Sequence, residues 1–243
     1  MHVYKIRTRN GKTLFQLPPG YDPFGVLARK RAGVKALVQA VQESDAQEFR
    51  KTLSAYIHDG DILQSAFRRI ARLSPPPRKF QRAIVHLMNE HGDLLRQEVG
   101  NDLVLCDALR VLLPPYKGSR SLRLYRGERA INRKRRTYGL AWSRSREVAE
   151  CFAQGSLQRT CDGGTVLLET NAPPRAIIGS IDSWRNEDEV IVDRRYLDRV
   201  RVLARYPQKP LIAIGGPSAL RPPAESTKQE EKTGTDADEK QRK

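Results

Sequence analysis

Three short segments in the second half of the chain carry residue types that could do chemistry. They are Leu124-Tyr125-Arg126-Gly127, Ala141-Trp142-Ser143 and Glu187-Asp188-Glu189-Val190-Ile191-Val192. An arginine fork can bind phosphate, a serine hydroxyl can hydrogen-bond a sugar, and carboxylates can stabilise positive charge or accept a proton. Each segment alone also has an ordinary interpretation, as a rim arginine, a residue before a helix or a solvated loop. Their order and spacing therefore matter more than any one of them.

The surrounding sequence, about residues 116–216, predicts a mixed and mostly β domain that would position these segments. One helix is expected to begin after the N-cap candidate Ser145 and to bury Val148, Ala149, Phe152 and Ala153. Gly163-Gly164 is expected to form a turn. The β-rich runs that predict strands are Leu122–Arg126, Val166–Thr170, Arg175–Ile178, Glu189–Val192 and Arg199–Ala204.

The first half has a different periodicity. Residues 2–17 predict a β-hairpin around Asn10-Gly11, within a segment 1–20. Apolar residues at helical spacing then predict about five helices over 21–115, interrupted by the prolines at 75–77 and closed by those at 114–115. The tail 217–243 is polar and is expected to be disordered. The predicted fold class is α+β.

In their order and spacing the three segments resemble the arginine–serine–glutamate class of ADP-ribosyltransferases, which includes arginine-modifying toxins and vertebrate ecto-enzymes. The resemblance covers about residues 122–216 and implies a split β-sandwich domain. Tyr125-Arg126 fills the first family position, and Ser143 with Phe152-Ala153 fills the second. Glu187-x-Glu189, followed by Val190-Ile191, fills the third.

One position departs from the family pattern. The family has a Ser-Thr-Ser strand, and the preferred register places Ala141 at its first serine. The missing hydroxyl removes a hydrogen bond that, in the family, helps to hold the catalytic glutamate. A register shifted to Ser143-Arg144-Ser145 restores both serines but moves the following helix by two residues.

The resemblance implies NAD+ as co-substrate, two catalytic carboxylates and no metal. Glu189 would stabilise the positive charge that develops on the ribose when the bond to nicotinamide breaks. Glu187 would orient or deprotonate the acceptor.

The resemblance also implies a set of cofactor-binding residues. Arg126 would bind a phosphate of NAD+, and Gly127 would let the nicotinamide carboxamide approach the backbone. Ser143 would hydrogen-bond the ribose or the glutamate. Tyr138 and Trp142 would stack on or wall the nicotinamide, while core packing is an equal alternative for Trp142.

The activity implied is mono-ADP-ribosyl transfer from NAD+ to an arginine or nucleic-acid acceptor, because the family's Glu-x-Glu members use such acceptors. A toxin of a toxin–antitoxin or phage-defence system, with an antitoxin as partner, fits this activity. Two alternatives stay open: a catalytically inactive relative that binds nucleic acid, and an NAD glycohydrolase that transfers the ribosyl cation to water.

The charge favours a polyanionic or acidic partner. Lys and Arg number 44 against 28 Asp and Glu, a formal net charge of +16. Between Lys117 and Arg136 nine basic residues accompany one acidic residue, Glu128. The run Arg133-Lys134-Arg135-Arg136 is therefore predicted to bind the acceptor, with a solvated loop as the alternative.

Several other classes lose support. The spacing of His86 and His91 does not suit paired metal ligands, and the three cysteines form no CxxC motif, so no metal site is predicted. Phosphate-loop, Rossmann and serine-hydrolase motifs do not occur in the sequence. It shows no signal-peptide pattern and no apolar run of about 18 residues. A cytoplasmic protein with no membrane partner is the expectation.

Overall fold

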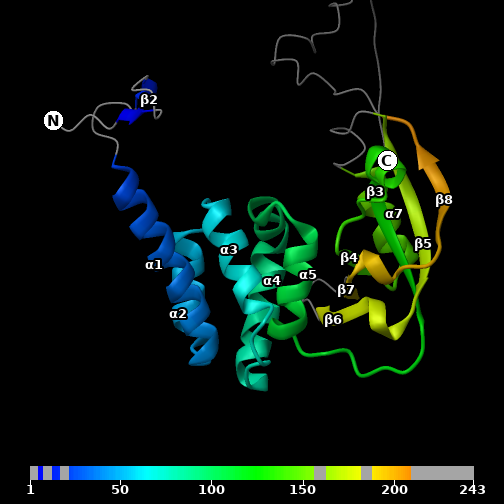
Figure 1. Cartoon of the computed structure of the whole chain (residues 1–243). Helices are drawn as coiled ribbons and strands as arrows, with labels where there is room; N and C mark the ends of the chain where they lie inside the picture. Colours follow the sequence, from blue (N-terminus) through cyan, green and yellow to red (C-terminus); the bar gives the residue numbers. More distant parts are fainter. Residues whose placement is uncertain (1–4, 8–12, 17–21, 156–162, 182–187, 209–243) are drawn as a thin grey trace, which may run out of the picture. The chain divides into compact units, whose positions relative to one another are not determined.

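A computed structural model describes residues 5–7, 13–16, 22–155, 163–181 and 188–208 of the chain (Figure 1). These residues belong to one compact unit. The predicted tail 217–243 and the last residues of the predicted 116–216 domain lie outside the described ranges. In the described part, α-helices and an antiparallel sheet occur together, so the α+β prediction is confirmed at that level.

The chain begins with two short antiparallel strands, β1 (Lys5–Arg7) and β2 (Thr13–Gln16). Ile6 pairs with Phe15. The Asn10-Gly11 turn predicted between the strands lies outside the described residues.

Five α-helices follow. They are α1 (Pro23–Gln42), α2 (Ala46–Ala55), α3 (Gly60–Ile70), α4 (Arg78–Val99) and α5 (Asp102–Leu112). Polar side chains cap four of them, because each accepts a hydrogen bond from a free N–H of the first turn; these are Asp22, Asp45, Asp59 and Asn101. The helix α4 ends at Gly100, whose φ of 63° lies in the left-handed region that glycine adopts readily.

Apolar stripes of these helices form a continuous core. Leu37, Leu53, Ile62 and Leu105 are at most 1 % exposed. Phe49 of α2 packs edge-on against Phe80 of α4, with ring centroids 5.8 Å apart. No helix of the described residues is both long enough and apolar enough to cross a membrane.

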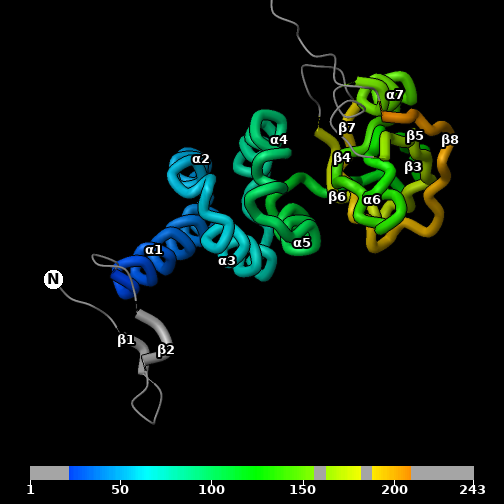
Figure 2. Tube along the Cα trace, turned by 90° about the horizontal axis from the view of Figure 1, so that it is seen from above, coloured from blue at the N-terminus to red at the C-terminus, as the bar shows by residue number. Residues whose placement is uncertain are grey.

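The second part of the chain builds a six-stranded sheet in the order β6-β7-β4-β3-β5-β8, with all neighbouring strands antiparallel. The strands are β3 (Leu122–Arg129), β4 (Ala141–Ser143), β5 (Thr165–Ala172), β6 (Ile177–Ile181), β7 (Glu189–Val192) and β8 (Val200–Tyr206). Two helices interrupt them, α6 (Ala130–Arg135) and α7 (Arg146–Gln154). Figure 2 shows α6 and α7 with the strands of this sheet.

The two faces of the sheet are covered differently. The face that we call the α7 face carries Gly127, on which α7 packs so closely that a Cβ there would lie 2.5 Å from the Ala149 carbonyl oxygen. The opposite face, which we call the core face, buries Leu124 and Trp142 in an apolar cluster. Alternation along β3 puts Tyr125 and Gly127 on the α7 face and Leu124, Arg126 and Glu128 on the core face.

Two local predictions are wrong. Phe152 is 51 % exposed and does not belong to the buried side of α7, which consists of Ala149 and Ala153. The sequence also predicts a single helix in this domain, but residues 130–135 of the basic run form a second one, α6.

Candidate functional site

Strand pairing brings two of the predicted site residues together. In the three-residue strand β4, Ser143 lies opposite Tyr125 of β3 on one side and opposite Glu189 of β7 on the other. Directly opposed residues of antiparallel strands project their side chains from the same face. Tyr125, Ser143 and Glu189 therefore share the α7 face, with Ser143 buried and Glu189 half-buried.

The chain around Ser143 explains the local geometry. The Ser143 Oγ accepts a hydrogen bond of 3.0 Å from the Ser145 backbone N–H, where the strand turns into α7. The Ser145 Oγ in turn accepts from the Val148 N–H at 3.2 Å and caps the helix. Ser145 lies beyond β4, so this geometry favours the register that places Ala141 and Ser143 on the strand.

Arg126 lies apart from that pair. Its Nε donates to Glu128 Oε2 at 2.8 Å, and its Nη1 donates to the Ala141 carbonyl oxygen. Its guanidinium also lies against Gly139, where a Cβ would collide with it. Because Arg126 projects from the core face, the structure does not bring it beside Ser143 and Glu189. Its third nitrogen, Nη2, makes no hydrogen bond with the described residues.

Arg126 lies where the backbone pairing between β3 and β4 ends. All eight residues of β3 pair with β5, whereas in the described residues β3 pairs with β4 only through Tyr125 and Ser143. Beyond that pair the Arg126 guanidinium bridges the strands by its bond to Ala141. At this point a hydrogen bond from the Arg126 side chain takes the place of backbone hydrogen bonds between β3 and β4.

Glu128 holds the Arg126 guanidinium in this position, a role that the sequence motifs do not indicate. Its side chain is 4 % exposed and accepts hydrogen bonds from Arg126 Nε, the Arg129 N–H, Asn132 Nδ2 and the Gly139 N–H at 2.8–2.9 Å. Burial by itself raises the pKa of this carboxyl, but the charge of Arg126 and the donated hydrogen bonds lower the pKa to about 2. Its isolation as the one acidic residue among nine basic ones was the signal that could have identified it.

Two aromatic residues assigned to the nicotinamide lie in the core. Tyr138 and Trp142 are 6 % and 1 % exposed, and their rings meet edge-on with centroids 6.2 Å apart. The Trp142 Nε1 donates to the Gly139 carbonyl oxygen at 3.1 Å. The structure thus favours core packing for Trp142, on the face opposite Ser143.

The second predicted carboxylate, Glu187, lies outside the described residues. Its neighbour Asp188 is described and has a φ of 44°, in the left-handed region. The Asp188 carbonyl oxygen accepts from the Arg144 N–H at 3.2 Å, which joins the start of β7 to the end of β4. This bond holds the chain in place immediately before Glu189.

The basic run borders a hollow of about 510 Å³. Arg133 and Lys134 lie on α6, and Arg136 ends that helix with a φ of 56°. The hollow is lined by Ala130, Ile131, Arg133, Lys134, Gly163 and Arg205. Arg205 comes from β8, so the fold adds a cation that was not included in the predicted acceptor site.

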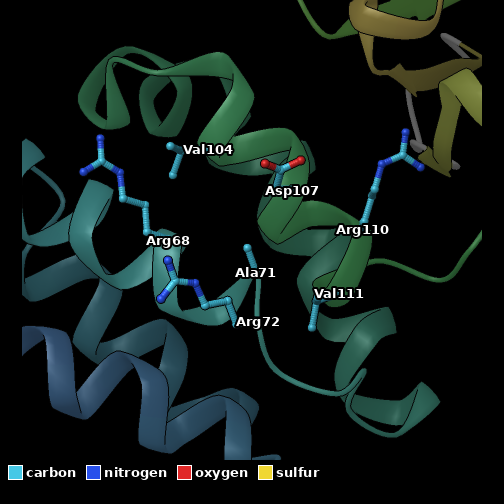
Figure 3. Close-up of a pocket in the computed structure, with 7 residues that line it drawn as sticks. All are labelled: Arg68, Ala71, Arg72, Val104, Asp107, Arg110 and Val111. Atoms are coloured by element: carbon cyan, nitrogen blue, oxygen red, sulfur yellow. The ribbon is translucent and has the colours of Figure 1, made fainter.

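A second hollow, of about 430 Å³, lies among the helices between α3 and α5 (Figure 3). Arg68 and Arg72 lie on one side of it, while Arg110 extends away from them. Arg110 donates to Asp193 Oδ2 at 3.2 Å. Asp107, which also lines this hollow, forms an ion pair with Arg195.

No known protein family, no curated protein and no solved structure matches this chain. Its function therefore has to be inferred from its own residues and their geometry.

Proposed function

We propose that this chain is an NAD-dependent mono-ADP-ribosyltransferase with an ADP-ribosyltransferase-like split β-sandwich domain. The observation that supports the proposal most is the register of β4, which sets Ser143 beside Glu189 on one face. Residues 124–127, 141–143 and 189–192 of the three segments singled out in the sequence lie on the neighbouring strands β3, β4 and β7. A hydroxyl next to a half-buried carboxylate is an arrangement suited to holding a ribose near a fixed negative charge.

In the proposed reaction the bond between nicotinamide and ribose C1′ breaks, and nicotinamide leaves with the electron pair. Glu189 stabilises the positive charge that develops on the ribose, and Ser143 keeps the carboxylate and the ribose in place. The acceptor nucleophile, on an arginine or a nucleic acid, then bonds to C1′. We assign the removal of its proton to Glu187.

The resemblance assigns Arg126 to a phosphate of NAD+, whereas the structure places its guanidinium on the core face, opposite Ser143 and Glu189. Nη2, the nitrogen that neither Glu128 nor Ala141 binds, is the atom that we propose for this contact. Glu128 is then a positioning residue, since it holds the guanidinium where β3 and β4 part. At Gly127 the backbone of α7 fills the space that a side chain would occupy, so the close packing of this helix already accounts for the glycine.

A second candidate function is nucleic-acid binding without catalysis. Two observations favour it: Ala141 stands where the family has a serine, and Arg126 is already bonded to Glu128. A third candidate, NAD glycohydrolase activity, differs only in using water as the acceptor. A toxin neutralised by an antitoxin is the cellular context that we propose for either catalytic activity.

The test is incubation of the full chain with NAD+ labelled in its adenylate half and with cell lysate, followed by protease or nuclease digestion. Label in protein or nucleic acid supports the transferase, and label only in free ADP-ribose supports the glycohydrolase. Intact NAD+ throughout contradicts both and leaves the binding module. Lysate without the chain is the control, because label that appears there comes from another enzyme; Glu189→Gln is expected to lose the label that the wild type adds.

A further inference from the structure

Many arginines of the sheet region are neutralised by carboxylates. Arg126 pairs with Glu128, and Arg201 and Arg123 both approach Glu169. The turn after β7 follows the same rule, since Arg194 pairs with Asp102 and Arg195 with Asp193. Apart from Arg133, Arg135, Arg136 and Arg205, seven of the eleven arginines described between residues 116 and 208 form an ion pair; the other four are Arg120, Arg129, Arg144 and Arg199.

The cations around α6 differ. In the described ranges Arg133, Lys134, Arg135, Arg136 and Arg205 form no ion pair. Arg133 makes one long contact of 3.4 Å from Nη2 to the Val200 carbonyl oxygen, and its buried Nε has no hydrogen-bond partner among the described residues. An unmet N–H on a cation costs free energy that a negatively charged ligand can offset.

The buried carboxylate of Glu128, on the same face, does not neutralise these cations. Glu128 lies at the end of β3 and bonds Asn132 of α6, but it is buried and also engaged by Arg126 and two backbone N–H groups. None of the described residues that line the hollow beside α6 carries a carboxylate. The positive potential there is therefore left for a ligand.

The hollow has an apolar side as well. Ala130 and Ile131 contribute to its lining, and Ile131 is 40 % exposed. Gly163 lies at its edge, and a Cβ built on it would meet nothing within 4 Å. Cations beside a small exposed apolar surface suit a ligand with phosphates and flat bases better than a simple inorganic anion.

We propose that the hollow between α6 and β8, lined by Arg133, Lys134, Arg205 and Ile131, binds the phosphodiester backbone of a nucleic acid. The further claim that this nucleic acid is the ADP-ribose acceptor rests on the transferase activity proposed above. The binding itself does not. Because Arg205 of β8 lies across the hollow from Arg133 and Lys134 of α6, the proposed site has cations on two sides.

The site is separate from the Ser143–Glu189 pair. From Tyr125, which pairs with Ser143, to Ala130 there are five residues of extended or nearly extended chain, about 16 Å at about 3.3 Å per residue. Arg205 lies opposite Val166, which in turn lies opposite Glu128 on the core face, and Ala130 of α6 packs against the apolar cluster of that face. Ser143 and Glu189 lie on the α7 face. Binding can therefore be weakened without altering the residues proposed for chemistry.

The experiment measures fluorescence anisotropy of labelled 20-nucleotide RNA, single-stranded DNA and duplex DNA with the full chain and no NAD+. Lys134→Ser with Arg205→Ser removes two cations from the hollow. The matched control is Arg68→Ser with Arg72→Ser, which removes two exposed cations from the hollow among the helices. Both double variants lower the net charge equally, and Arg133 is left unchanged because its contact to β8 could contribute to folding.

We expect the Lys134/Arg205 variant to bind at least one of the three probes about tenfold or more weakly at 100 mM salt, with the control within about twofold of the wild type. The slope of log affinity against log salt should fall by about 1.4–1.8 for two lost phosphate contacts. Equal losses in both variants would show that only net charge matters and would overturn the proposal. Undetectable binding of all three probes would overturn it too, as would competition by inorganic phosphate at the same concentration of phosphate groups.

The proposed enzymatic activity succeeds or fails independently. A chain that binds nucleic acid through Lys134 and Arg205 but leaves NAD+ intact supports the site and contradicts the transferase. Transfer of ADP-ribose to protein by a chain that binds no nucleic acid supports the transferase and contradicts the site.

Discussion

The two faces of the six-stranded sheet use charged and polar groups in opposite ways. On the α7 face, Ser143 and Glu189 are neighbours, whereas Arg126, the cation assigned to the cofactor, projects from the other face. On the core face, Arg126 and Glu128 form a buried pair, and the cations of α6 beyond them have no carboxylate partner in the described residues. In the sequence, Arg126 and the cations of α6 belong to one basic cluster between Lys117 and Arg136. The structure separates them into a cation that builds the sheet and cations available to a ligand.

The largest effect is expected on the α7 face. Glu189→Gln should lower ADP-ribosyl transfer and NAD+ hydrolysis by a hundred- to a thousandfold, because a fixed carboxylate acts on charge in the transition state. The melting temperature of the Glu189→Gln variant should stay within about 1 °C of that of the wild type, because the substitution removes one charge from a half-buried side chain and keeps its size. Rates with labelled NAD+ and a thermal scan check both. A variant that keeps more than a tenth of the activity removes Glu189 from the catalytic role.

On the core face the main effect should be on folding. Arg126→Ala leaves Glu128 as a buried carboxylate without its cation, and we expect a loss of about 3 kcal/mol in the free energy of unfolding. Adding Glu128→Gln should recover part of that loss, because the stranded charge disappears. Urea titrations of the two single variants and the double variant measure the coupling. Additive losses would mean that the two side chains do not stabilise each other.

The same Arg126→Ala variant also tests its proposed contact with NAD+. Loss of a charge-assisted phosphate contact is worth about 1.5–3 kcal/mol, so KM for NAD+ should rise at least about tenfold. The measurement is made at a temperature where the variant remains folded by circular dichroism. An unchanged KM would leave Arg126 with a structural role alone.

Acid should weaken the core face selectively. The pKa of Glu128 is about 2 in the folded chain, below the ordinary 4.5, so its contribution is fully present above pH 4.5 and is lost as the pH falls toward 2. That contribution is on the order of 3 kcal/mol for a shift of this size. The difference in unfolding free energy between wild type and Glu128→Gln should therefore shrink between pH 5 and pH 2.5. A difference that stays constant over this range would contradict the lowered pKa.

Glu187→Gln should have a smaller and more specific effect. If Glu187 takes the acceptor's proton, the variant should lose transfer about tenfold or more while NAD+ hydrolysis changes much less. The ratio of the two rates, measured with the same labelled NAD+, is the readout. Equal losses in both rates would show that Glu187 does not act on the acceptor.

The smallest effect should come from Phe152→Ser on α7. Since this side chain is 51 % exposed, its replacement should change the free energy of unfolding by less than about 0.5 kcal/mol. The matched variant Ala153→Ser introduces a polar group at a fully buried position of the same helix and should cost more than 1 kcal/mol. The reverse order would mean that Phe152 packs against the protein in solution.

The sequence by itself determined the local elements. Side chains such as Asp45 and Asn101 begin helices by accepting hydrogen bonds from N–H groups of the first turn. Apolar spacing shows which side of a helix is buried, although Phe152 of α7 is an exception. Alternation along the predicted strand Leu122–Arg126 likewise puts Leu124 and Arg126 on one face before any fold is known. These features depend on neighbours within a few residues along the chain, so local chemistry is enough to predict them.

Only the tertiary structure decided which distant segments meet. Nothing local requires β4 to lie between β3 and β7, yet that order is what joins Ser143 to Glu189. The need for glycine at 127 comes from the close approach of α7, and Arg205 meets α6 only because β8 pairs with β5. Strand order and helix packing depend on burying apolar surface across the whole sheet, and a short sequence motif contains no information about that.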